Sequence, residues 1–157
     1  MREVLVTMED CLPVIARKLA EGGSVQLTAP GTSMLPLLEN SVVELTVANG
    51  PLKKHDIALY RRMDGEERFV LHRVIRTRTD GSYAMCGDNQ VLIESPIWPA
   101  QVIAKVSRFE QNGIMVSVDD PRYRRYARRR VASRPFRALI EQLHRMCKSL
   151  IRKNAHE

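Results

Sequence analysis

Three short stretches of the sequence carry side chains suited to acyl transfer. Ser33 lies in Gly-Thr-Ser-Met-Leu-Pro (residues 31–36), a turn-like stretch that can expose a hydroxyl and aim nearby N–H groups at an oxyanion. His72 lies in Val-Leu-His-Arg-Val-Ile (residues 70–75), and Asp88 follows a glycine. A serine attacks well only beside a base of near-neutral pKa, which a carboxylate orients. The sequence predicts Ser33 as nucleophile, His72 as general base and Asp88 as the orienting carboxylate.

Each of these residues also has an ordinary structural interpretation. Ser33 can be a turn serine, and Asp88 can close an Asx turn. His72 has Val70 and Val74 as same-face neighbours on a strand, which also suits a buried, hydrogen-bonded histidine. The spacing of the residues leaves both interpretations open.

Further residues follow from the same hypothesis. Backbone N–H groups beside Ser33 should form the oxyanion site, with Thr32 and Met34 as the expected oxyanion or substrate-binding residues. Lys105 is a rival base, because a buried lysine can lose its proton. The three cysteines are widely spaced and form no CxxC pair, so we expect unpaired thiols, no metal and no cofactor.

Four linked motifs add a family resemblance. They are Ser33-Met34-x-Pro36, residues 55–60 (His-Asp-Ile-Ala-Leu-Tyr), residues 72–75 (His-Arg-Val-Ile) and residues 87–89 (Gly-Asp-Asn). In this order they resemble the signal peptidase and repressor-protease superfamily over roughly residues 24 to 110.

The resemblance implies a β-rich fold, a serine nucleophile in the Ser-Met motif and cleavage of an extended peptide lying along a strand. Many members of the superfamily have a lysine base at the position of His72. In having a histidine there, this sequence resembles the endoplasmic-reticulum and archaeal signal peptidases, and the aspartate of their Gly-Asp-Asn motif corresponds to Asp88. Family signal peptidases carry a hydrophobic N-terminal helix, whereas here the expected helix is short and charged. We therefore do not expect a housekeeping role in secretion.

The elements that would position these residues are mostly strands. Short runs rich in Val, Ile and Leu, separated by Gly, Asn, Asp and Pro, are typical of an antiparallel sheet or a partly closed barrel. Asp-Gly pairs in residues 63–66 and 79–81 predict hairpin turns. The expected strands are Ser24–Ala29, Val42–Val47, Asp56–Arg62, Arg68–Arg76, Tyr83–Cys86, Val102–Phe109 and Gly113–Val118.

Helices are expected at both ends of the chain. Apolar residues at three- and four-residue steps predict an amphipathic helix from Thr7, as its cap, to Glu21, ended by Gly22. A second apolar stripe runs from Phe136 to Ile151. The expected segments are an N-terminal helix (1–22), a β-rich peptidase domain (23–120) and a basic amphipathic tail (121–157).

Charge is distributed unevenly along the 157 residues. The net charge is +7, yet residues 121–157 alone hold twelve Lys or Arg against two Glu, or +10, which leaves −3 for residues 1–120. Such a tail can dock on the body or a second copy, lie on an anionic membrane surface, or grip RNA through its arginines and tyrosines. We expect docking or membrane contact before nucleic acid, and no DNA partner.

The sequence as a whole predicts a serine endopeptidase of mainly β structure, cleaving a peptide or leader segment. No run is apolar over the roughly 18 residues a spanning helix needs, and no secretory leader is recognised. We therefore expect a cytoplasmic protein, with peripheral attachment to the inner membrane surface as the alternative. Two other hypotheses remain open. One is an inactive peptide-binding module of the same fold, and the other is an RNA-binding protein that works through its tail.

Overall fold

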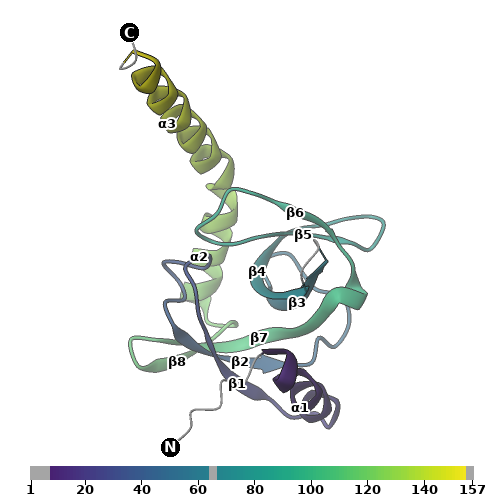
Figure 1. Ribbon diagram of the computed structural model, residues 1–157. Coiled ribbons are helices and arrows are strands. Elements are labelled where there is room, and N and C mark those ends of the chain that lie inside the picture. The colour runs from purple at the N-terminus through teal and green to yellow at the C-terminus, as the bar shows by residue number, and fades with distance from the viewer. Residues whose placement is uncertain (1–7, 64–66, 155–157) are drawn as a thin grey trace, which may run out of the picture.

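A computed structural model describes residues 8–63 and 67–154 of the chain (Figure 1). In this part of the chain it is mainly β, with an eight-stranded antiparallel sheet and three α-helices. The elements are α1 (Met8–Ala20), β1 (Val25–Ala29), β2 (Ser41–Thr46), β3 (Ile57–Met63), β4 (Glu67–Thr77), β5 (Tyr83–Cys86), β6 (Glu94–Ile97), the 3-10 helix η1 (Pro99–Gln101), β7 (Val102–Gln111), β8 (Ile114–Ser117), α2 (Pro121–Ala132) and α3 (Arg134–Asn154).

The strands follow the order β1-β2-β7-β3-β4-β5-β6, and β8 pairs with β7. The sheet is open and not a closed barrel, because β1 and β6 stand at the two ends of this order. Of the two forms that the sequence left open, an antiparallel sheet is therefore confirmed. Strands β3 and β4 pair over seven residues near its middle, and this register sets His72 opposite Ala58.

The first four residues of strand β3, residues 57–60, are buried on both faces of the sheet. Ile57 and Leu59 enter one apolar cluster, whereas Ala58 and Tyr60 enter the other. All four are at most 3% exposed. Side chains of a strand alternate between faces, so a continuous apolar run is what a strand covered on both sides requires.

Helix α1 packs one apolar stripe into the first of these clusters. Ile15 and Leu19, four residues apart, are 5% and 4% exposed. The helix ends where Gly22 takes a φ of +78°, a left-handed conformation that glycine adopts at little steric cost. The expected cap Thr7 lies outside the described residues.

All seven expected strands form, with shifts of one or two residues at most of their ends. The hairpin turn expected at residues 79–81 also forms, with Gly81 at a φ of +83°. Residues 64–66 of the other expected turn lie outside the described part of the chain. The eighth strand, β6, was not expected, since Pro96 lies within it.

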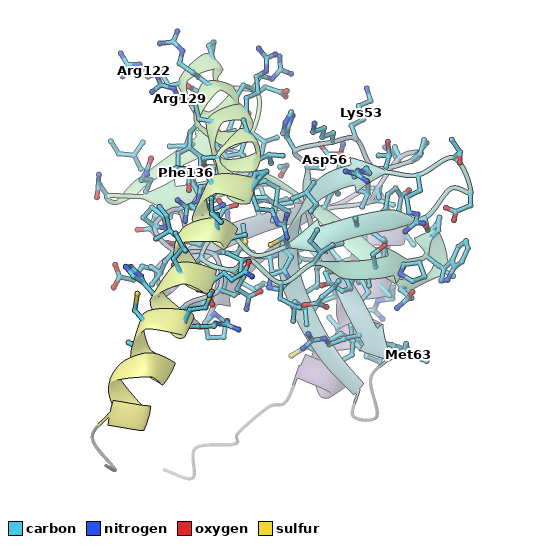
Figure 2. The ribbon with its side chains drawn as sticks, turned by 90° about the horizontal axis from the view of Figure 1, so that it is seen from above. Lys53, Asp56, Met63, Arg122, Arg129 and Phe136 are labelled. Atoms are coloured by element: carbon cyan, nitrogen blue, oxygen red, sulfur yellow. The ribbon has the colours of Figure 1, made fainter. Side chains whose placement is uncertain are left out.

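Helix α2 is part of the packed body, although its residues lie beyond the boundary at residue 120 that composition suggested. Asp120 caps it by accepting hydrogen bonds from the N–H groups of Arg122 and Tyr123, at 2.7 and 3.3 Å. Tyr123 and Ala127 are 7% and 1% exposed and join the first apolar cluster. Arg122 and Arg129 instead point outward (Figure 2).

Helix α3 continues from α2 and extends away from the sheet (Figure 1). None of the helices in residues 8–63 and 67–154 is both long enough and apolar enough to cross a membrane.

Candidate active site

Ser33 and His72 line the same cavity, which has a volume of about 260 Å³. The cavity lies between the segment that follows β1, the middle of β4 and the segment that leads into β6. Its other lining residues are Ala29, Pro30, Gly31, Met34, Leu38, Arg62, Phe69, Val70, Leu71, Gln90 and Glu94. The fold thus brings the predicted nucleophile and base to one site from positions 39 residues apart in sequence.

Ser33 is held by a tight turn after strand β1. The N–H groups of Leu37 and Leu38 both donate to the Met34 carbonyl oxygen, at 3.0 and 3.1 Å. Met34 is only 4% exposed and anchors the turn in the apolar core. Ser33, one residue earlier, is left half-buried at the cavity wall.

The Gly-Asp-Asn segment fixes this turn from the other side. The Asn89 N–H donates to the Ser33 carbonyl oxygen at 2.7 Å, and the Asn89 amide donates to the Thr32 carbonyl oxygen at 3.2 Å. The N–H groups of Ser33 and Met34 have no hydrogen-bond partner among the described residues. Free N–H groups beside a nucleophile are what an oxyanion site requires. Thr32 is exposed and is not a lining residue of the cavity.

Gly87 allows the nucleophile turn and the histidine to approach each other closely. A Cβ atom at this position would lie 2.6 Å from the Ser33 carbonyl oxygen and 3.1 Å from His72 Nε2. Both distances are too short for ordinary packing, so only glycine fits here without a shift. The same distances place the Nε2 atom of His72 next to Gly87, which also contacts the Ser33 turn.

The other ring nitrogen of His72 is held by a tyrosine and a glutamate. His72 Nδ1 lies 3.2 Å from the Tyr60 hydroxyl oxygen and 3.3 Å from Glu94 Oε1. Tyr60 donates its proton to Glu94 Oε2 at 2.8 Å. A hydroxyl has one proton, so the contact between Nδ1 and the tyrosine oxygen needs a proton on Nδ1. Nε2 is then the unprotonated nitrogen, as a general base toward Ser33 requires.

Burial sets the charge state of this cluster. It lowers the pKa of His72 below the ordinary value for histidine, and the charge of Glu94 only partly opposes this effect. Burial and the nearby Glu94 raise the pKa of Tyr60, which keeps its proton. Arg62 pairs with Glu94 at 2.9 Å and holds the carboxylate from its outer side. His72 is therefore neutral near pH 7.

Asp88 has a different set of partners. Its two carboxylate oxygens accept hydrogen bonds from Arg73 Nε and one terminal nitrogen, both at 2.7 Å, and one of them also accepts from the Tyr126 hydroxyl at 3.1 Å. Arg73 further donates to the Tyr123 hydroxyl at 2.8 Å and to the His55 carbonyl oxygen at 3.0 Å. Although burial opposes its charge, the bonds to Asp88 raise the pKa of Arg73. The pair is 1% and 2% exposed.

The expected hydrogen bond between Asp88 and His72 is thus absent from the described contacts, and Glu94 occupies the orienting position. Neighbouring side chains of a strand point to opposite faces, so Arg73 and His72 lie on opposite faces of β4. Asp88 is bound to Arg73 and therefore does not reach the His72 ring. Asp88 still acts on His72 through its charge, which tends to raise the histidine pKa. It is an electrostatic neighbour and a structural ion-pair partner.

The rival base Lys105 lies elsewhere. It lines a second cavity together with residues 53–56 and parts of α2, whereas Ser33 lines the first. In the described part of the chain, no group of three or more His, Cys, Asp or Glu side chains is arranged to hold a metal ion.

Sequence reasoning missed two residues of the site, Glu94 and Tyr60. Tyr60 lies in one of the motifs that carry the resemblance, and strand pairing places it two residues from the partner of His72. Glu94 lies in no such motif. It begins strand β6, which the sequence pattern did not predict because Pro96 lies within it. Both become visible only when β3, β4 and β6 are set in space.

In the described residues, the Ser33 hydroxyl and the His72 ring share a cavity without a direct hydrogen bond between them. Such bonds are often long before substrate binds. The arrangement can therefore support proton transfer from a serine to a neutral, oriented imidazole. Comparison of the chain with protein-family models, with curated proteins and with solved structures found no match.

Proposed function

We propose that this protein is a serine endopeptidase of the signal peptidase and repressor-protease type, in which Ser33 is the nucleophile and His72 the general base. The observation that carries the proposal is the two-sided placement of the His72 ring. Nδ1 is held by Tyr60 and Glu94, while Nε2 lies next to Gly87, which also contacts the Ser33 turn. A histidine kept only for packing has no need of this tautomer or this direction.

The reaction follows from these positions. As Ser33 Oγ forms a bond to the carbonyl carbon of the scissile peptide, its proton passes to His72 Nε2, and the carbonyl π electrons move to the oxygen. The free N–H groups of Ser33 and Met34 would stabilise that oxyanion. Collapse of the intermediate breaks the C–N bond, and His72 returns the proton to the leaving amine. A water molecule then hydrolyses the acyl-enzyme by the same route.

The orienting roles differ from those expected from sequence. Glu94, through Nδ1 and through Tyr60, would stabilise the imidazolium that forms during attack. Asp88 would support catalysis indirectly, because its ion pair with Arg73 fixes the segment that donates to the Ser33 carbonyl oxygen. The proposed unit is therefore Ser33, His72 and Glu94.

Two features suit an extended peptide as substrate. Strand β1 ends the strand order, so the edge that faces away from β2 has no strand partner among the described residues. A peptide can add to such an edge through main-chain hydrogen bonds. Ser33 follows the end of β1 by four residues, and the cavity wall beside it includes the apolar side chains of Leu38, Phe69 and Leu71.

The test is covalent labelling with a fluorophosphonate probe, followed by mapping of the modified residue. We expect modification of Ser33, and loss of labelling by at least about a hundredfold in both Ser33→Ala and His72→Ala, since nucleophile and base act as one unit. The double variant should lose little more. His144→Ala, which changes an exposed histidine of α3, is the control and should label normally.

Two results would contradict the proposal. Labelling that survives in His72→Ala but disappears in Lys105→Ala would assign the base to the lysine. A folded native protein that takes up no phosphonate, yet binds extended peptides, would instead be a peptide-binding module of the same fold.

A further inference from the structure

Helix α3 leaves an apolar stripe in solvent, and this stripe goes beyond the proposed peptidase site. Its members recur at three- and four-residue steps and so share one side of the helix. The exposed fractions are 66% for Phe136, 52% for Leu139, 38% for Ile140, 51% for Leu143 and 55% for Met146. From this stripe and the charges around it we infer that α3 binds the surface of an anionic lipid membrane, lying in the interface without crossing it.

The net charge of α3 and of the outer side of α2 is positive. Among the described side chains of α3 from residue 138 onward, Arg145 and Lys148 are basic and Glu141 is acidic, and the glutamate is already paired with Arg145. Helix α2 adds exposed arginines on its outer side, of which Arg122 and Arg129 are seen in Figure 2. Apolar side chains can enter the headgroup region while such cations remain among lipid phosphates.

The body of the protein does not cover the stripe. Arginines at the start of α3 fix the helix to the Asp88–Val91 segment: Arg137 donates to the Asp88 carbonyl oxygen at 2.7 Å, and Arg134 donates to the Val91 carbonyl oxygen. Beyond these contacts α3 extends away from the sheet, as Figures 1 and 2 both show. Docking the stripe on the sheet would require these partly buried contacts to break.

A second copy of the chain fits the stripe less well than a membrane does. Paired helices use a narrow seam with acidic and basic residues facing each other across it. Here the apolar side is wider, from Met146 through Leu143 to Ile140, and the described part of α3 holds more basic than acidic side chains, so two copies would bring like charge together. Nucleic acid would use the cations but would leave the apolar side chains in water. An anionic lipid surface satisfies both features.

Membrane contact would also set the orientation of the cavity. The segment clamped by Arg134 and Arg137 continues to Asn89, whose N–H holds the Ser33 carbonyl oxygen. If α3 lies on a lipid surface, the cavity lined by Ser33 and His72 would therefore be held at a fixed distance from that surface. This inference does not depend on catalysis, and its test reads binding alone.

The experiment is co-sedimentation of the full chain with phosphatidylcholine vesicles, with and without phosphatidylserine, over a range of salt concentrations. We expect binding to the phosphatidylserine vesicles that weakens as salt rises, because exposed charges are screened over about 8 Å at physiological ionic strength. Two matched variants each add one negative charge to α3. Leu143→Glu places it in the stripe and should lower the partition coefficient roughly tenfold or more. Gln142→Glu places it at the edge of the stripe, where the side chain can still reach water, and should lower it about fivefold at most.

Other outcomes would overturn the inference. Equal losses in Leu143→Glu and Gln142→Glu, or no sedimentation with anionic vesicles at low salt, would exclude burial of the stripe in lipid. Dimers that form without lipid and dissociate in Leu143→Glu would assign the stripe to a second copy. Tight RNA binding that is equal in the native chain and Leu143→Glu, without vesicle binding, would assign the cations to nucleic acid. Circular dichroism and the thermal midpoint of both variants check that the fold is intact.

Discussion

Replacing Glu94 with glutamine keeps the size of the side chain and removes the negative charge next to His72. Glu94 Oε1 lies 3.3 Å from His72 Nδ1, and the two side chains are 10% and 4% exposed. At an effective dielectric constant of about 20, full charges at this distance attract by about 5 kcal/mol. Arg62, 2.9 Å from the same oxygen, offsets part of this attraction.

We therefore assign about 2 to 3 kcal/mol of imidazolium stabilisation to Glu94, which corresponds to a rate lower by roughly 30- to 150-fold in Glu94→Gln. Loss of the carboxylate in a Ser-His-Asp triad lowers the rate about 10⁴-fold, largely because the tautomer changes. The smaller value is expected here because the Tyr60 oxygen still accepts the Nδ1 proton.

Asp88→Asn is the matched comparison, since it makes the same chemical change on the other face of β4. It leaves the Arg73 guanidinium buried without an anionic partner, which typically costs about 3 to 5 kcal/mol. For a chain of this length the thermal midpoint should fall by roughly 10 °C. At a temperature where the variant is still folded, its labelling rate should stay within about threefold of the native rate.

The assay is the second-order rate constant for fluorophosphonate labelling of Ser33, with unfolding followed by circular dichroism. The reasoning is refuted if Asp88→Asn abolishes labelling while fully folded and Glu94→Gln labels at the native rate. Asp88 would then orient the base, as the sequence alone suggested.

Three further predictions concern the same site. Gly87→Ala would bring a Cβ within 2.6 Å of the Ser33 carbonyl oxygen, so the labelling rate should fall at least about tenfold while the fold is retained. A native labelling rate would show that the close approach of residue 87 to the Ser33 turn is unimportant. Burial lowers the pKa of His72, so the neutral base is lost only in acidic solution. The labelling rate should therefore fall on the acid side with a midpoint below about pH 6.5. A midpoint above about pH 7.5 would contradict His72 as the base. Tyr60→Phe should slow labelling about tenfold, because it removes a partner of His72 Nδ1. Tyr126→Phe should lower the free energy of unfolding by about 1 kcal/mol without changing the labelling rate. If Tyr126→Phe slows labelling and Tyr60→Phe only lowers stability, Tyr126 and not Tyr60 supports the base.

Periodicity and turn residues predict most of the sheet, because these signals are local. Strand β3 is an example, since its apolar run is what burial on both faces demands. Strand β6 was missed because Pro96 cannot donate to a ladder and so weakens the strand pattern. Its position at the end of the strand order explains why the proline is tolerated there.

The sequence predicted those residues of the candidate site that lie in recognisable motifs. Ser33 and His72 were found in this way, and they share a cavity. The choice between Asp88 and Glu94 was not open to sequence reasoning, because it depends on which face of β4 each carboxylate meets. Arg73 decides that choice, and its partner Tyr123 lies 50 residues further along the chain.

The dependence of the body on α2 has a consequence for the order in which this protein matures. The chain is synthesised from its N-terminus, so every strand exists before Tyr123 and Ala127 can close the first apolar cluster. Until then Arg73 lacks its tyrosine partner, and the Gly-Asp-Asn segment lacks the arginines that hold it. We expect the proposed active site to become competent only after residues 121–137 have left the ribosome. Phosphonate labelling of ribosome-bound chains of increasing length would measure that delay, and labelling of chains stalled within β8 would exclude it.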